Sequence, residues 1–170
     1  MMGTFDTCYG DLLDYAAKGC FDVIVHGCNC FCTMSGGIAA PISSRFPAAL
    51  KADSETAEGD RSKLGSYTSA TVAIGSTTKT NRTALTVVNA YTQYMYRPTR
   101  ETPIPCDYDA IDKVMARINQ DFAGKSIGLP QLGAGLAGGD WKTIEEIIRK
   151  RLHSCHVTIV LFKASQTPSE

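Results

Sequence analysis

Val23-Ile24-Val25-His26-Gly27-Cys28-Asn29-Cys30, followed closely by Ser35-Gly36-Gly37-Ile38-Ala39, is the stretch that decides the fold. An apolar run carries a histidine and an asparagine at its end, and a glycine pair then opens a helical pattern. This order predicts a buried strand, a polar loop and a helix N-terminus, which is how a parallel sheet presents polar groups to a phosphate-bearing ligand. A second glycine cluster, residues 133–139, repeats the same order later in the chain. Two such loops that face each other predict a site for a diphosphate.

Size and charge narrow the class of protein. The chain has 170 residues and a mass of 18.3 kDa, so we expect a single domain over residues 1–170. Its 17 basic and 17 acidic residues cancel, which leaves no electrostatic footprint for duplex nucleic acid or an anionic membrane. No apolar run approaches the roughly 20 residues of a membrane span, and residues 1–14 do not resemble a signal peptide. We therefore expect a cytoplasmic monomer.

The seven cysteines match neither a disulfide scaffold nor a zinc site. Their number is odd, and the chain has enough apolar residues to form a core without disulfide bonds. Cys28, Cys30 and Cys32 alternate as C-x-C-x-C, whereas structural zinc sites show C-x₂₋₄-C followed by a second pair of ligands. His153 and His156 form an H-x-x-H pair without a nearby acidic residue. We expect reduced thiols, no metal and no cofactor.

Hydrophobic periodicity predicts strands that alternate with helices. Short runs rich in β-branched residues predict strands, several of them buried on both faces. Apolar residues at spacings of three and four predict two amphipathic helices, and a further helix ends before Pro47. This alternation favours an α/β fold with three layers (α/β/α) and a mostly parallel mixed central sheet. The predicted strands are 4–9, 21–26, 67–74, 84–90, 126–130 and 157–162, and the predicted helices are 37–46, 108–122 and 141–152.

Residues 133–138 match the pattern G-x-G-x-x-G, but they are not a dinucleotide fingerprint. That fingerprint needs an acidic residue about 20 positions further on to hold a ribose, and residues 157–160 contain none. Consecutive small residues between a strand and a helix still allow the backbone to approach a phosphate closely. The alternative is a tight turn without a ligand.

Four polar residues have both a functional and a structural interpretation. His26 lies where the predicted strand meets its loop, so it is either a catalytic acid, base or nucleophile or a hydrogen-bonded core histidine. Asn29 either contacts a ligand or shapes the loop. Asp11 precedes Leu12-Leu13, where its structural role is that of a turn residue or a helix cap. Asp140 precedes the predicted helix at 141–152, where aspartate caps free N–H groups. The sequence contains no standard phosphatase or kinase signature, so any phosphate cleavage would use His26 and a carboxylate across the cleft.

Together these elements resemble the macrodomain family, an ADP-ribose-binding α/β/α module. The resemblance covers residues 10–162 and rests on three motifs in the right order. Gly10-Asp11-Leu12 matches G-D-[IL], whose aspartate accepts the adenine amino group in the family. Residues 26–29 with 35–39 match the N-A-A-N strand end and its glycine-rich loop, and residues 130–138 match the P-x-[IL]-G-x-G-[IL]-x-G segment.

The departures from the family pattern indicate a branch. Histidine replaces the first asparagine of N-A-A-N, which is similar to the branch of ADP-ribose 1''-phosphate phosphatases, where this histidine is implicated in catalysis. A related branch removes ADP-ribose from glutamate with a lysine and an aspartate, and Gln93 and Ala137 stand in those places here. The glycine triplet of many ADP-ribosyl hydrolases is reduced to Ser35-Gly36-Gly37.

The resemblance implies a metal-independent phosphatase acting on ADP-ribose 1''-phosphate. The alternatives are an ADP-ribosyl hydrolase that acts on a modified macromolecule and a non-catalytic ADP-ribose reader. The expected ligand is ADP-ribose or ADP-ribose 1''-phosphate, with adenine against Asp11 and Phe162 and the distal ribose at Asn29. The predicted catalytic residues are His26 and Asp140, and the predicted ligand-binding residues are Asp11, Leu12, Asn29, Ser35, Gly36, Gly37, Ile38, Gly133, Ala134, Gly135, Leu136, Ala137, Gly138 and Phe162.

Overall fold

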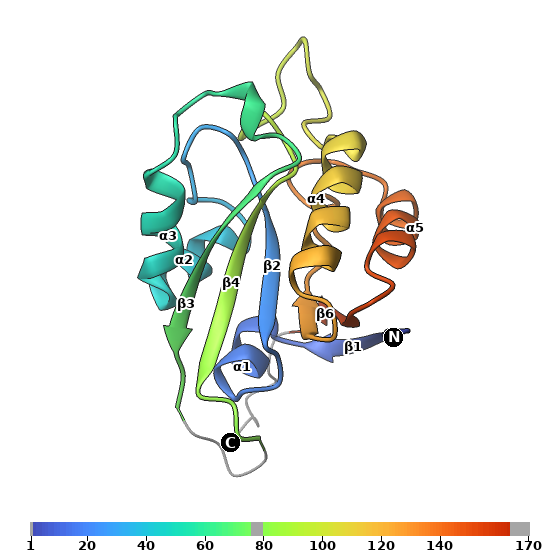
Figure 1. Ribbon diagram of the computed structural model, residues 1–170. Helices are drawn as coiled ribbons and strands as arrows, with labels where there is room; N and C mark the ends of the chain where they lie inside the picture. Colours follow the sequence, from blue (N-terminus) through green and yellow to red (C-terminus); the bar gives the residue numbers. More distant parts are fainter. Residues whose placement is uncertain (1, 76–79, 164–170) are drawn as a thin grey trace, which may run out of the picture.

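A single mixed sheet with helices on both faces forms the centre of the computed structural model (Figure 1). The structure describes residues 2–75 and 80–163, so the predicted domain of residues 1–170 includes Met1, 76–79 and 164–170, which lie outside the described residues. The described strands are β1 (Thr4–Gly10), β2 (Val23–Cys28), β3 (Tyr67–Ala73), β4 (Ala84–Tyr91), β5 (Ser126–Leu129) and β6 (His156–Phe162). The described helices are α1 (Leu12–Ala17), α2 (Ala39–Arg45), α3 (Pro47–Ser54), α4 (Tyr108–Asp121) and α5 (Trp141–Arg151), with a short 3₁₀ helix, η1 (Arg61–Lys63).

The strand order is β1-β6-β5-β2-β4-β3. Neighbouring strands from β1 to β4 in this order are parallel, and only the β3–β4 pair is antiparallel. Parallel strands need crossover connections, and these place helices on both faces of the sheet. The predicted three-layer α/β/α fold with a mostly parallel mixed sheet is therefore confirmed.

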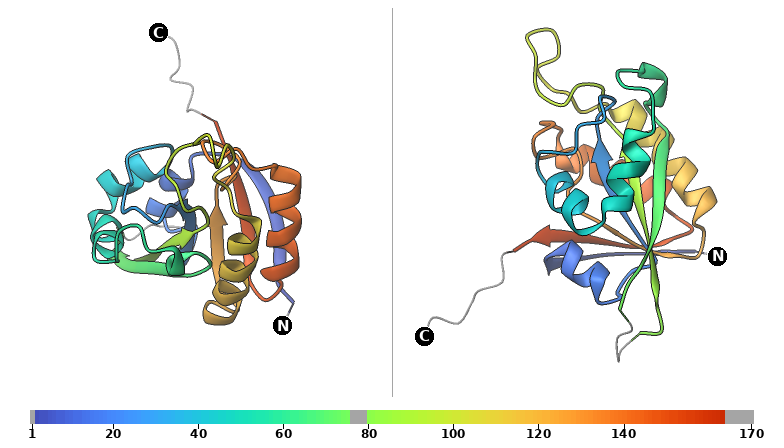
Figure 2. Two further views of the ribbon diagram at one scale, coloured as in Figure 1. Left: turned by 90° about the horizontal axis from the view of Figure 1, so that it is seen from above. Right: turned by 90° about the vertical axis from the view of Figure 1, so that its left-hand side faces the viewer.

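Each face of the sheet has its own apolar core, beneath the helices that cover it in Figure 2. The helices α4 and α5 cover one face, and α1, α2 and α3 cover the other. The predicted spacing of the α4 residues is confirmed, because Ile111, Met115 and Ile118 are fully buried against the sheet. In α5 the same holds for Ile144 and Ile148.

One predicted helix has a different start, and two short helices were not predicted. The helix predicted over 37–46 begins only at Ala39, because Gly37 has a φ of 55°, which lies outside the helical region. Pro47 ends that helix as expected, but it also starts α3, where a residue without an N–H loses no intrahelical hydrogen bond. Neither α3 nor the six-residue α1 was predicted, since both are short and weakly periodic.

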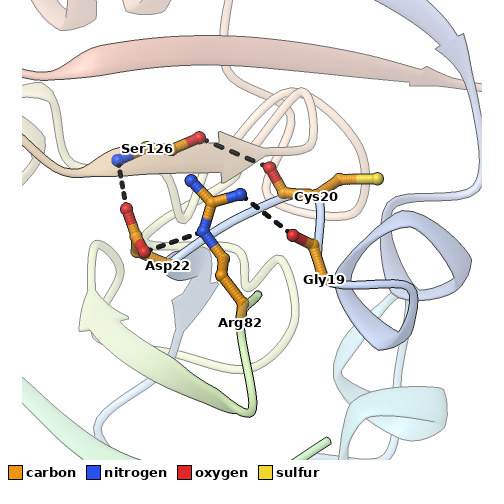
Figure 3. Close-up of polar contacts among 5 residues, drawn as sticks. All are labelled: Gly19, Cys20, Asp22, Arg82 and Ser126. Atoms are coloured by element: carbon orange, nitrogen blue, oxygen red, sulfur yellow. Dashed lines mark hydrogen bonds and ion pairs between the residues drawn. The ribbon is translucent and has the colours of Figure 1, made fainter. Parts of the chain in front are cut away.

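Hydrogen bonds and an ion pair connect the segments at the amino ends of the central strands (Figure 3). Asp22 precedes β2, and its carboxylate accepts hydrogen bonds from Arg82 Nε at 2.8 Å and from the Ser126 N–H at 2.9 Å. Arg82 Nη1 also donates to the Gly19 carbonyl at 2.9 Å. Partial burial disfavours the charged carboxylate, but these hydrogen bonds outweigh it and lower the pKa of Asp22. The amino ends of β2 and β5 are thus held to the segment that precedes β4.

Among residues 2–75 and 80–163, no helix combines the length and apolar character needed to traverse a lipid bilayer.

Candidate functional site

A cleft of about 290 Å³ lies at the carboxyl ends of the neighbouring parallel strands β2 and β5. In open α/β sheets the loops that follow the strands form the ligand crevice, so this is the expected position for a site. Loops that follow β2, β4 and β5 contribute its lining. The site therefore gathers residues that are distant in the sequence.

The loop between β2 and α2 forms the first wall of the cleft. Asn29, Thr33 and residues 35–39 line it. Among the described residues, the backbone N–H groups of Gly36 and Gly37 have no hydrogen-bond acceptor. These N–H groups are free to bind an anion in the cleft.

The loop between β5 and α5 forms the second wall, through residues 130–133 and 135–137. The Gly138 N–H donates to the Gly135 carbonyl at 3.0 Å, and the Gly139 N–H donates to the Gly133 carbonyl at 2.7 Å. These bonds fold the loop into successive turns. Within the described part of the chain, the N–H groups of Gly135 and Leu136 have no acceptor either.

Leu136 brings the two walls together. Its side chain is 66% exposed and reaches the glycine pair of the first wall. A Cβ placed on Gly36 would lie 3.0 Å from Leu136 Cδ1, and one placed on Gly37 would lie 3.6 Å from it. The close approach therefore favours glycine at position 36, whereas at position 37 the positive φ of 55° favours it.

The structure brings most of the predicted ligand-binding residues together in the cleft. The lining includes Asn29, Ser35, Gly36, Gly37, Ile38, Gly133, Gly135, Leu136 and Ala137. Ala134 and Gly138 belong to the second wall but do not line the cleft, because their positions turn the loop instead.

Asn29 lines the cleft and also fixes the shape of its own loop. Its Oδ1 accepts a hydrogen bond from the Phe31 N–H at 2.8 Å, and its Nδ2 donates to the Thr33 carbonyl at 2.8 Å. The loop-forming interpretation is therefore confirmed. One Nδ2 hydrogen and one Oδ1 lone pair remain for a ligand.

His26 does not lie in the cleft, contrary to our expectation. Its imidazole is fully buried and its Nε2 donates to Asn89 Oδ1 at 2.7 Å, since Asn89 Nδ2 is used as a donor to the Ala49 carbonyl. The predicted location of His26 at the strand end is wrong because β2 continues to Cys28. His26 therefore lies within the strand and points toward α3. Burial is the main cause that lowers the pKa of His26 to about 4, against a smaller opposing effect of the Asn89 hydrogen bond.

Asp140 is the N-cap of α5, as the structural interpretation predicted. Its carboxylate accepts hydrogen bonds from Thr143 Oγ1 at 2.7 Å and from the Thr143 N–H at 3.1 Å. These bonds lower the pKa of Asp140, so the group is an ionised carboxylate at neutral pH and carries no proton to donate to a leaving oxygen. Asp140 does not line the cleft.

The residues predicted to hold adenine lie beside the cleft rather than in it. Asp11 is the N-cap of α1, where its Oδ1 accepts from the Leu13 and Asp14 N–H groups at 2.9 and 3.3 Å. Phe162 is 78% exposed at the end of β6, in register with Gly10 of β1. The Leu12 side chain is buried in the core. Asp11 and Phe162 thus share the carboxyl edge of the sheet with the cleft.

Several lining residues were missed in the sequence. Gly27 was quoted only as part of a motif, yet a Cβ there would lie 2.7 Å from Thr92 Oγ1. Gln93 was placed at a site position only through the family resemblance, and Tyr96 was not considered. Both follow β4, and the rule that ligands meet strand ends would have found them if the β2–β4 pairing were known. The other missed residues are Cys28, Thr33, Ala39, Pro130, Gln131 and Leu132.

The described lining of the cleft contains no Asp, Glu, Lys, Arg or His side chain. Its polar groups are amides, hydroxyls, one thiol and backbone N–H groups. Burial raises the pKa of the Cys28 thiol, so this group is protonated at neutral pH. Among the described residues, no three His, Cys, Asp or Glu side chains gather in a way that would hold a metal ion. The cleft offers neutral hydrogen-bond donors to an anionic ligand.

Comparison with known proteins agrees with this architecture. A family model described as Macro domain matches residues 25–148. An uncharacterized 17.5 kDa protein of enterobacteria phage T4, from the tk-vs intergenic region, is 33% identical over 156 residues, which cover 89% of this chain and 92% of that protein.

Solved structures show the same fold at low sequence identity. The macrodomain of Mycobacterium tuberculosis DarG has a TM-score of 0.64 and 22% identity, with 93% of this chain and 97% of that chain covered. Thermosipho africanus DarTG in complex with ADP-ribose has a TM-score of 0.66 and 14% identity, with 98% of this chain and 43% of that chain covered.

Proposed function

Since this chain belongs to the macrodomain family, an ADP-ribose-binding family, we propose that its cleft binds ADP-ribose or a derivative of it. The observation that carries the proposal is the set of unpaired backbone N–H groups on both walls, at Gly36, Gly37, Gly135 and Leu136. Such groups hold phosphate oxygens without a cationic side chain. The diphosphate lies between the two loops.

The order of the strands gives the ligand a direction. Asp11 follows β1 and Phe162 is the last residue of β6, whereas Asn29 and Gln93 follow β2 and β4 on the other side of β5. With the diphosphate between the two walls, adenine lies toward Asp11 and Phe162. The distal ribose then lies toward Asn29.

Asp11 provides the first test of this orientation. We expect both Asp11→Ala and Asp11→Asn to weaken ADP-ribose binding by about 1–3 kcal/mol, because each removes a charged acceptor of the adenine amino group. Asparagine retains an oxygen that caps α1, so only the alanine variant loses about 1 kcal/mol of stability. Calorimetric titration and thermal denaturation measure the two effects. Unchanged affinity in Asp11→Asn would place adenine elsewhere.

We propose further that the chain hydrolyses ADP-ribose 1''-phosphate. The support is the resemblance of the H-G-C-N-C segment at residues 26–30 to the phosphatase branch. His26 itself is buried outside the cleft and takes no part in the proposed step. A water oxygen attacks phosphorus, the bond to the 1'' oxygen breaks, and phosphate and ADP-ribose leave. Because the lining holds no acidic or basic side chain, a phosphate oxygen of the substrate takes the water proton and passes it to the leaving oxygen. The unpaired N–H groups stabilise the charge that develops on the phosphate.

The uncharged lining also supports a second candidate, a reader that binds ADP-ribose without turnover. A general acid or base in the cleft is the usual requirement for efficient proton transfer, and the lining has none. An ADP-ribosyl hydrolase that uses lysine and aspartate is less well supported, because Gln93 and Ala137 line the cleft in those places.

A turnover assay separates these candidates. With ADP-ribose 1''-phosphate as substrate and a chelator present, we expect release of inorganic phosphate together with ADP-ribose. Free ADP-ribose titrated in parallel gives the affinity of the same protein preparation. Binding without phosphate release identifies a reader, and release of ADP-ribose from a modified macromolecule identifies a hydrolase. A strict metal requirement would contradict the proposed site.

A further inference from the structure

Lys63 is a buried lysine outside the cleft, and the proposed chemistry does not use it. It ends η1 and is 8% exposed. Its Nζ donates to Thr56 Oγ1 at 2.8 Å and to Cys32 Sγ at 3.7 Å. None of the ion pairs among the described residues includes it. The Asp53 carboxyl group is near enough to interact electrostatically with Lys63, and the Tyr91 ring centroid lies 5.2 Å from Nζ. Burial of an amino group without a direct ion pair is still unfavourable, so its contacts require an explanation.

Lys63 and the segment after α3 hold Cys32 in an unusual conformation. Cys32 has a φ of 56°, and no other non-glycine residue among those described has a positive φ. Its thiol lies 3.3 Å from both the Asp53 carbonyl and Thr56 Oγ1. Thr56 Oγ1 in turn donates to the Asp53 carbonyl at 2.6 Å. Lys63, Thr56 and Asp53 therefore surround the Cys32 side chain and offset the strain of its backbone.

Cys32 lies in the loop whose two ends line the cleft. The Asn29 side chain is bonded to the Phe31 N–H and the Thr33 carbonyl, on either side of Cys32. The Cys30 carbonyl is fixed by the Gly59 N–H at 2.7 Å, again from the segment that leads to Lys63. A change in the backbone at Cys32 therefore moves the groups that orient the Asn29 amide.

We propose that Lys63 is a positioning residue for the Asn29 end of the cleft, acting through Cys32, and that it sets the preference for ligands that carry a distal ribose. This inference rests on the proposed function, in which the distal ribose lies toward Asn29. ADP has the adenine and the diphosphate of ADP-ribose but lacks the distal ribose. Lys63 therefore affects the binding of ADP-ribose and leaves the binding of ADP unchanged.

The test is calorimetric titration of ADP-ribose and of ADP into wild-type protein and Lys63→Met, which keeps an apolar stem of similar length. We expect the affinity for ADP-ribose to fall about tenfold or more and that for ADP to stay within about twofold. Lys51→Met, on the exposed surface of α3, is the matched control and should change neither affinity. If Lys63→Met does not fold, Thr56→Val removes the 2.8 Å acceptor of Lys63 together with the hydroxyl that itself lies 3.3 Å from Cys32 Sγ, and it is expected to cause the same selective loss.

The outcomes are distinct. Equal loss of both ligands, or loss of neither, in folded Lys63→Met and Thr56→Val would show that Lys63 supports only the fold and would overturn the inference. Wild-type protein that binds neither ADP nor ADP-ribose would instead refute the proposed function, and this inference with it.

Discussion

Replacing His26 with alanine is expected to lower the free energy of unfolding by about 2–5 kcal/mol. The imidazole is fully buried, so its removal leaves a cavity beneath the sheet, and Asn89 Oδ1 loses its donor at 2.7 Å. Urea denaturation followed by circular dichroism measures the change. Because His26 does not line the cleft, the folded fraction should retain its affinity for ADP-ribose.

The same residue makes stability depend on pH. Its pKa is about 4 in the folded protein and about 6.5 in the unfolded chain, so the unfolded chain binds the proton more readily. The stabilising contribution is complete above pH 6.5 and is lost as the pH falls toward 4, by about 3 kcal/mol in total. His26→Leu cannot titrate. The difference in unfolding free energy between wild type and this variant should therefore shrink by that amount between pH 7 and pH 4.

The opposite result would restore the catalytic interpretation of His26. In that case the His26→Ala protein would melt at the wild-type temperature but would turn over ADP-ribose 1''-phosphate at least about a hundredfold more slowly. A loss of about a hundredfold is the usual scale for removal of an acid–base group. Kinetics and melting measured on one purified preparation distinguish the two cases.

Gly135→Val is expected to reduce the affinity for ADP-ribose at least about a hundredfold, which is about 2.7 kcal/mol. Gly135 lines the cleft and its N–H is unpaired, so a phosphate must approach its backbone closely. A Cβ at this position would meet no atom of the described protein within 4 Å, and the φ of Gly135 is not positive. The fold should therefore tolerate valine, with a stability change within about 0.5 kcal/mol.

Gly75→Val is the matched control for this prediction. Gly75 is also exposed, has no atom within 4 Å of its Cβ position, and follows β3 at the edge of the sheet opposite the cleft. The affinity of the Gly75→Val protein for ADP-ribose should equal that of wild type in the same titration. If folded Gly135→Val binds as tightly as Gly75→Val, the diphosphate does not lie against the second wall.

Most of the cleft could be predicted because its residues directly follow strands that the sequence reveals. The two glycine loops need only the local order of strand, loop and helix, and that order is correct at both places. Gln93 and Tyr96 could not be found in this way, because their presence depends on β4 lying beside β2, and strand order is a property of the whole fold. The role of Lys63 depends on contacts from a connecting segment without periodicity.

His26 shows how a small error in a strand boundary becomes an error in a site. The predicted strand ended at residue 26, whereas β2 runs from Val23 to Cys28. Side chains alternate between the faces of a strand, and Val25 packs on the α4 side while His26 faces α3. A strand two residues longer therefore turns a residue expected at the site into a residue of the core.

The bonds of Asp22, Arg82 and Ser126 lie at the amino ends of the strands, opposite the cleft. Insertions or substitutions in the two cleft loops leave these bonds intact, since none of the residues 29–38 and 131–138 takes part in them. Ligand recognition and the anchoring of the sheet are thus encoded by separate residues at the two ends of the same strands. This separation makes the architecture evolvable, because the loops can diversify toward new substrates while the strands that carry them keep their alignment.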